Sequence, residues 1–268
     1  MEIRRHQGSM LLAGLAVLGL TVGCVSGPRY EPQVFGGANY PSPAEILTGR
    51  FERNPPEFYA TRLKRLRANG VPDTLAGYEA IAVTLDSLGR YDDAIFALKS
   101  QAVVMHRSDS PATSDDWSLH HADYGRFLLN RWMSQGADWR MIGEVKSARD
   151  HVALAIQIQP NASDPREEVM LDMLNWIIAC RTPDSRSSFA SWLGRKGAVQ
   201  IDRETPGLLG LIAGNDSRLP VDVYDGLEFC FSAAANPHMA GFARLREEEL
   251  RPANAFLVVP PTDSSLDT

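Results

Sequence analysis

The sequence predicts an all-α protein on three observations. From Glu57 onward, apolar residues recur at helical spacing. Alternating β-branched runs between hairpin turns do not occur, and the one strand-like patch, Phe256 to Val259, is short. Apolar residues make up 44% and charged residues 22% of the 268 residues, which is typical of a globular chain and excludes a fibrous one. The net charge of −6 argues against nucleic acid as a partner, because phosphates attract a surplus of cations.

Residues 1–23 are expected to be a signal peptide. Arg4 and Arg5 form a positive start, and residues 10–23 are apolar or small and carry no charge. These 14 residues are too few to cross a hydrocarbon layer of about 30 Å at 1.5 Å per residue. A charged start followed by a short apolar core is typical of a secretion signal.

The end of this segment, Leu20-Thr21-Val22-Gly23-Cys24, resembles a bacterial lipobox. The resemblance implies cleavage before Cys24, acylation of its thiol and new amino group by fatty acids such as palmitate, and a lipoprotein anchored to a membrane of the bacterial cell envelope. Several acyl chains hold a soluble domain on a membrane firmly, which one chain does only weakly. Since Val25 and Ser26 follow, rather than an Asp that would imply retention in the inner membrane, the resemblance favours an outer membrane where one is present. The alternatives are an ordinary cleavable signal and a single-span anchor.

Residues 24–56 are expected to form a tether after the lipidated cysteine. Six prolines and four glycines lie between residues 27 and 56, and the segment lacks apolar periodicity. Proline at this density opposes helix and sheet, so the composition favours an extended spacer. The alternative is a loop packed on the domain through Tyr30, Phe35 and Tyr40.

Residues 57–183 are expected to form helical repeats. Tyr59, Leu63 and Leu66 are spaced as on one helix face. Two longer apolar stripes follow. They comprise Tyr78, Ile81, Ala82, Leu85 and Leu88, and then Ile95, Leu98, Ala102 and Met105.

Residues 78–98 resemble a tetratricopeptide repeat (TPR), a hairpin of two closely packed helices. Small Ala82 and Ala94 permit the close approach, and Gly89 suits the turn. Asp92 and Asp93 suit the first turn of the second helix, where the dipole favours anions. Gln101 departs from the family, which prefers Ala there. The matching positions are Tyr78, Ile81, Ala82, Leu85, Gly89, Tyr91, Ala94 and Leu98.

A second, interrupted unit follows. The two small residues are 12 positions apart in the first unit and 23 apart in the second, from Gly125 to Ala148, so eleven residues are inserted around 132–143. His121 replaces the usual apolar opener. A third helix is expected from Glu167 to Ala179, with Val169, Met170, Met173, Trp176 and Ile177 inward. The second unit's matching positions are Tyr124, Gly125, Leu128, Ala148, Val152, Ala155 and Pro160.

The inserted stretch carries Trp132, Met133, Trp139 and Met141. Exposed Trp and Met favour recognition surfaces. The favoured reading is that both indoles pack on the repeat core, and the alternative is a recognition surface.

Residues 184–252 are expected to form a C-terminal helical cap on a short right-handed α-solenoid, and residues 253–268 a polar tail. Helices are expected at 206–213, 221–235 and 239–250, with a helix or loop at 185–192. Cys180 and Cys230 either pair, closing a 50-residue loop, or remain buried thiols. Thiols are favoured, because Cys180 continues the stripe of Trp176 and Ile177.

Catalytic motifs of the HExxH, P-loop, dinucleotide and GxSxG types do not occur, so we expect no enzyme and no cofactor. His120, His121 and Asp123 have metal-ligand side chains, but neighbouring histidines on a helix point about 100° apart. We expect His121 in the packed stripe and His120 near the surface, with a zinc site as the alternative. Arg62, Lys64, Arg65 and Arg67 form a basic cluster, either a solvated helix face or a contact with anionic lipid.

The TPR resemblance implies a concave face that holds a protein or peptide segment, and hence a non-catalytic scaffold or adaptor at the cell envelope. The alternatives are an envelope enzyme or metal-binding protein using His120 and Asp123, and a structural subunit of an outer-membrane assembly or secretion complex. From helix geometry, the expected partner-binding residues are Tyr78, Thr84, Asp86, His120, Asp123 and Arg126.

Overall fold

The computed structural model describes residues 41–50, 54–68, 70, 72, 74–107, 112–160, 164–180, 187–196, 201–214 and 221–251. These ranges are helical and contain no strand, which confirms the predicted all-α class. The signal segment, Cys24, the aromatic residues proposed as loop anchors, the strand-like patch and the tail lie outside the described residues.

The helices lie close to the positions that the periodicity predicts. They are α1 (Pro43–Thr48), α2 (Pro56–Arg67), α3 (Leu75–Ser87), α4 (Tyr91–Arg107), α5 (Ser114–Ser134), the 3-10 turn η1 (Trp139–Met141), α6 (Ile142–Ile158), α7 (Pro165–Ala179), α8 (Phe189–Gly194), α9 (Ile201–Gly214), α10 (Asp222–Ala233) and α11 (Pro237–Leu250).

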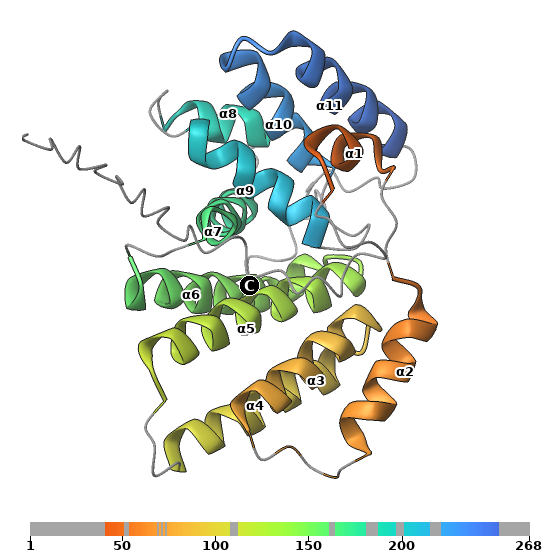
Figure 1. The fold of residues 1–268 in the computed structure, drawn as a ribbon. Coiled ribbons are helices and arrows are strands. Elements are labelled where there is room, and N and C mark those ends of the chain that lie inside the picture. The colour runs from red at the N-terminus through yellow and green to blue at the C-terminus, as the bar shows by residue number, and fades with distance from the viewer. Residues whose placement is uncertain are drawn as a thin grey trace, which may run out of the picture.

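The helices pack as two halves. Helices α2 to α6 form the lower half in Figure 1, and α7 to α11 form the upper half together with α1. In the lower half, α3 pairs with α4 and α5 pairs with α6, and α4 packs against α5. In the upper half, α7 packs against both α6 and α9, so it joins the halves.

The α3–α4 hairpin has the expected close contact. Gly89 turns the chain with φ of 73°, and Asp92 and Asp93 lie in the first turn of α4. Ala82 and Ala94 are fully buried, as is Leu98. The small residues therefore lie where the two helices meet, as the sequence predicts.

The α5–α6 pair is held together at Gly125. A Cβ added there would lie 2.6 Å from Val152 Cγ2 and 2.8 Å from the carbonyl oxygen of Ala148. Ala148, Val152 and Ala155 are fully buried, so the predicted inward face of α6 is confirmed. Pro160 follows the end of the helix and is exposed.

The inserted residues lengthen this second hairpin and add no separate element. Trp132 is 1% exposed and donates from Nε1 to the carbonyl oxygen of Asp138 at 3.0 Å. Trp139 packs edge-on against it, with ring centroids 6.1 Å apart, and Met133 is buried. Met141 is partly exposed, at 39%. The favoured prediction, that both indoles pack on the core, is confirmed.

The prediction of an extended tether is wrong for residues 43–48, which form α1. Pro43 begins the helix, where a missing N–H costs little, and Ser42 and Glu45 form a capping box. Gly49 ends it with φ of 64°. Ile46 and Leu47 are buried, and α1 packs against α9 and α11. The N-terminal segment thus reaches the C-terminal helices, nearly 200 residues away in sequence.

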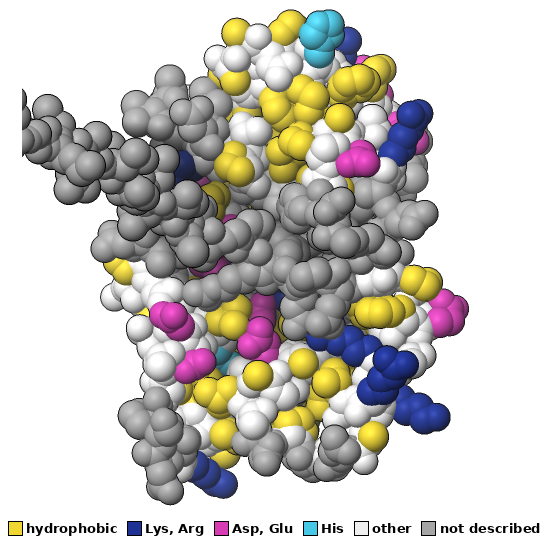
Figure 2. Space-filling view, viewed as in Figure 1, with side chains coloured by type: hydrophobic (Ala, Val, Ile, Leu, Met, Phe, Trp, Pro, Cys, Tyr) yellow, Lys and Arg dark blue, Asp and Glu magenta, His cyan; other side chains and the backbone are white. Residues whose placement is uncertain are grey.

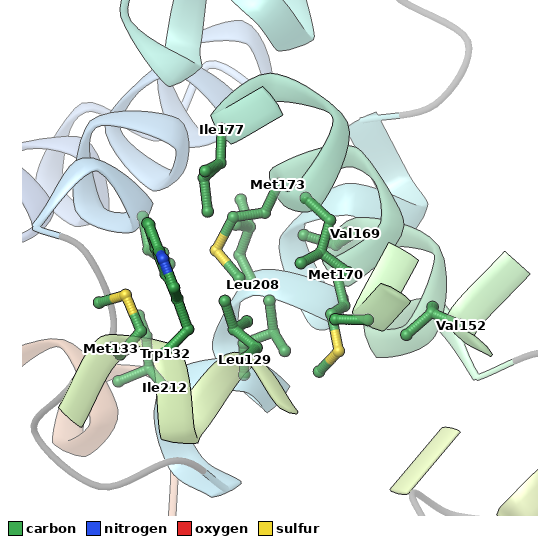
Figure 3. Packing of buried hydrophobic residues seen from close by; sticks show 14 of the residues in the cluster. Leu129, Trp132, Met133, Val152, Val169, Met170, Met173, Ile177, Leu208 and Ile212 are labelled. Carbon is green, nitrogen blue, oxygen red and sulfur yellow. The ribbon is translucent and has the colours of Figure 1, made fainter. Parts of the chain in front are cut away.

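A continuous apolar core joins the two halves (Figure 3). The sticks show Leu129 and Trp132 of α5 facing Met173 and Ile177 of α7, with Leu208 of α9 between them. All five predicted inward residues of the third helix are buried. The upper-half helices lie where expected, except that α9 begins at Ile201 and extends through Pro206.

Cys180 and Cys230 are buried and are not joined in a disulfide, as the favoured interpretation predicts. Burial raises the pKa of Cys230 to about 12, so that thiol stays protonated. Each helix in the described ranges is too short or too polar to traverse a lipid bilayer.

Replacing Gly125 with Ala should destabilise the protein by about 1–3 kcal/mol, because a methyl group there overlaps the α6 backbone. Gly241 of α11 has no atom within 4 Å of an added Cβ, so Gly241→Ala should stabilise the protein by about 0.5–1 kcal/mol through helix propensity. Urea denaturation of both variants measures the changes. Equal shifts in the two variants would contradict the close contact at Gly125.

Candidate functional site

Three of the six expected partner-binding side chains are buried, and the other three are half-buried. Thr84, His120 and Asp123 are buried, so the expectation that they line an exposed face is wrong for these three. Thr84 Oγ1 donates to the carbonyl oxygen of Ala80 at 2.6 Å. Tyr78 is half-buried on α3. These side chains are buried because the helix faces expected to bind a ligand pack instead against other parts of the protein.

Gln101 links the first hairpin to the second. Its Nε2 donates to the carbonyl oxygen of Leu75 at 3.0 Å, and its Oε1 lies 2.9 Å from Nδ1 of His120. Since an amide oxygen only accepts, Nδ1 of His120 is the donor. The departure from the repeat pattern at Gln101 therefore satisfies a buried histidine of the next hairpin.

Further polar contacts join the first hairpin, α3–α4, to the second, α5–α6. Asn130 Nδ2 donates to Asp86 Oδ1 at 3.0 Å. Arg131 of α5 donates to Asp92 of α4 at 2.7 Å and binds both carboxylate oxygens of Glu144 of α6, at 2.9 and 3.2 Å. Bidentate pairs of this kind fix orientation as well as adding energy. They hold α4, α5 and α6 in register.

Arg126 and Asp123 form a pair within α5, at 2.9 Å, with side chains 13% and 8% exposed. The guanidinium also lies over the Phe127 ring, 5.0 Å from its centroid. The carboxylate of Asp123 therefore has a partner inside the protein, which weighs against its use as a metal ligand beside His120.

Four of the six histidines gather at one end of α4, α5 and α6, with Trp117 and Tyr124 among them. His120 is buried and His121 half-buried, the reverse of the expected placement. Burial lowers the pKa of His120 to about 4, helped by the neighbouring histidines, so this ring is neutral at pH 7. His121 Nδ1 lies 2.9 Å from Nδ1 of His151 on α6. Trp117 packs beside His106, His120 and His121.

The described residues contain no group of three or more His, Cys, Asp or Glu side chains arranged to hold a metal ion. Of the basic cluster on α2, Lys64, Arg65 and Arg67 are exposed and Arg62 is half-buried. Lys and Arg side chains gather over α2 in Figure 2. The exposure of these cations fits both a solvated helix face and a contact with anionic lipid, so the two predictions stay open.

Sequence reasoning missed a buried acidic pair between α7 and α9. Lys196, which follows α8, forms an ion pair with Asp172 and lies 3.9 Å from Oε1 of Glu204. Oε2 of Glu204 is buried without a hydrogen-bond partner among the described residues. Burial and the charge of Asp172 raise the pKa of Glu204 to about 7. The available signal was Asp172 itself, an acid on the inward face of α7 between Val169 and Trp176.

The most exposed large apolar side chain of the described residues lies on α4. Phe96 is 70% exposed and Val103, two turns later, is 45% exposed on the same face. Lys99 and Arg107 lie on this face too and are exposed. We call these four residues the α4 face. It combines apolar surface with the positive charge of Lys99 and Arg107. At its N-terminal end lie Asp92 and Asp93, which pair with Arg131 and Arg90.

Comparisons with protein-family models, with curated proteins and with solved structures gave no match.

Gln101→Ala should cost about 1–3 kcal/mol of stability, since it leaves Nδ1 of His120 and the Leu75 carbonyl without their partner. Lys99→Ala, at an exposed position of the same helix, is the control and should change stability by less than about 0.5 kcal/mol. Thermal or urea unfolding measures both. Similar small effects would mean that the Gln101 contacts add no net stability.

Glu204→Gln should change the pH dependence of stability. The folded-state pKa of Glu204 is raised above its ordinary value of 4.5 to about 7. The protonated side chain therefore contributes stability that is fully present below pH 4.5 and is lost as the pH rises through 7. Glutamine stays neutral throughout. The variant should therefore gain stability relative to the wild type between pH 5 and pH 8.

Urea midpoints at pH 5 and pH 8 measure this difference. Glu248→Gln, at an exposed position on α11, serves as the control. A difference between wild type and Glu204→Gln that stays constant with pH would show that Glu204 is ionised throughout this range.

Proposed function

We propose that the chain is a lipid-anchored protein of the bacterial cell envelope, acylated at Cys24, whose TPR-like hairpins act as a non-catalytic scaffold or adaptor for another protein. Two successive hairpins support this proposal, because each packs through small residues at the positions of the repeat pattern. In a solenoid, helix pairs of this kind stack on their neighbours and leave extended surfaces for partners.

The α4 face carries the proposal of partner binding. An aromatic side chain as exposed as Phe96 is costly to leave in water, and aromatic residues are frequent anchors at interfaces. Lys99 and Arg107 flank the apolar residues. We therefore infer a partner segment that presents apolar and acidic side chains, as an amphipathic helix does.

The internal contacts of His120 and Asp123 favour a scaffold over an enzyme or metal-binding protein that uses these two residues. Each is buried, and each already has a protein partner, Gln101 or Arg126. A catalytic group needs to reach its substrate within hydrogen-bond distance.

A photo-reactive amino acid placed at position 96 in the full chain, expressed in bacteria, should crosslink to a discrete envelope protein. The same amino acid at position 245, an exposed apolar position on α11 in the other half, is the matched control and should give no such product. Cys24→Ala should abolish palmitate labelling and membrane fractionation, and should reduce the crosslink at position 96.

Equal products from positions 96 and 245 would contradict a specific partner at the α4 face. Membrane association and palmitate labelling that survive Cys24→Ala would contradict the anchor.

A further inference from the structure

His121 and His151 form a pair across the close contact between α5 and α6. His121 comes from α5 and His151 from α6, and the two Nδ1 atoms are 2.9 Å apart with ring centroids 5.1 Å apart. Gly125, four residues after His121, holds the two helix backbones together. The pair is therefore positioned by packed helices rather than by loops, which favours a defined geometry.

Both rings are available as ligands. Burial lowers the pKa of His121 and of His151, which favours the neutral imidazole, the form that binds metal ions. In the structure one Nδ1–H donates to the lone pair of the other Nδ1. If the donating ring carries its proton on Nε2 instead, both Nδ1 lone pairs are free and neither ring loses a proton. Both side chains are half-buried.

We propose that Nδ1 of His121 and Nδ1 of His151 together bind a late first-row transition-metal ion, Cu²⁺ more tightly than Zn²⁺, with water completing the coordination. At metal–nitrogen distances of about 2.0–2.1 Å, two ligand nitrogens are about 2.9 Å apart at a right angle and about 3.3 Å apart at the tetrahedral angle. The present separation of 2.9 Å matches the right-angle arrangement of tetragonal Cu²⁺. Because the rings now face each other along the line between the nitrogens, binding requires both to turn toward a common point.

The surroundings support this pair rather than His120 and Asp123. Tyr124 stacks on His151 with centroids 4.4 Å apart, and Trp117 lies nearly parallel to His121. The carboxylate of Asp150 acts electrostatically on His151 and favours a cation there. Nδ1 of His120 is held by Gln101, so the described protein residues supply two ligands, in keeping with the absence of any three-residue metal group among them. The inference is independent of the proposed scaffold function.

The test is a Cu²⁺ titration of the full chain, purified without a histidine tag and followed by calorimetry. The wild type should bind one ion saturably, and His121→Ala and His151→Ala should each weaken binding by more than about 10-fold. His238→Ala, at an exposed position on α11, is the matched control, and Lys99→Ala, at an exposed position on α4, is a second control. Both should leave the titration unchanged. Zn²⁺ should bind at the same site more weakly.

A second measurement uses the wild type alone and so does not depend on how the variants fold. Pulsed electron paramagnetic resonance of the Cu²⁺ complex should detect two coordinated imidazoles. One imidazole or none overturns the proposal. So does a titration in which the His151 variant binds as tightly as the wild type, or in which the control variants lose binding equally.

Discussion

The contact of Gly125 with the backbone of α6 sets the geometry on which the rest of the protein depends. Because a side chain is missing there, α5 and α6 approach until Val152 and Ala148 touch the glycine. This spacing buries the inner face of α6 and brings His121 opposite His151. The same long helix pair then presents Leu129 and Trp132 to α7, so the core that joins the two halves rests on it (Figure 3). A glycine in mid-helix costs backbone entropy, and the packing of the neighbouring helix offsets that cost.

Helix α1, near the N-terminus, packs against the C-terminal helices α9 and α11. Ile46 and Leu47 fill a site against α9 and α11, and the guanidinium of Arg246 lies over Gly49, where a Cβ would be 2.7 Å from Nη2. Helix α2 then begins the lower half, so the chain crosses from one half to the other between α1 and α2 (Figure 1). Under the proposed anchoring at Cys24, at most 16 residues separate the lipid from residue 41.

The sequence predicts what is encoded locally and fails where distant segments meet. Apolar spacing and small residues are sufficient to place α3 to α7, because helix periodicity and the close approach at Ala82, Ala94 and Gly125 depend on residues near in sequence. Proline density gives the wrong prediction at α1, since Pro43 occupies the first position of the helix, where proline is tolerated. Burial of His120 could not be predicted, because it depends on Gln101 of the preceding hairpin. The pairing of Asp172 with Glu204 likewise joins positions 32 residues apart.

Buried polar groups gather at two borders, and this distribution has a physical reason. Apolar side chains such as those of α5 and α7 pack in several registers at similar free energy, whereas a buried donor or acceptor without its partner costs about 1–3 kcal/mol. The Gln101–His120 and Asp86–Asn130 bonds therefore select one placement of the second hairpin on the first. Lys196 beside Asp172 and Glu204 does the same for α8 and α9 on α7. At this second border, one oxygen of Glu204 lacks a hydrogen-bond partner among the described residues. Protonation, at a pKa of about 7, removes the buried negative charge. The border within the lower half is thus fixed by hydrogen bonds and by the ion pairs of Arg131 with Asp92 and Glu144. The α7–α9 border depends on a proton instead, so its packing is sensitive to pH near 7.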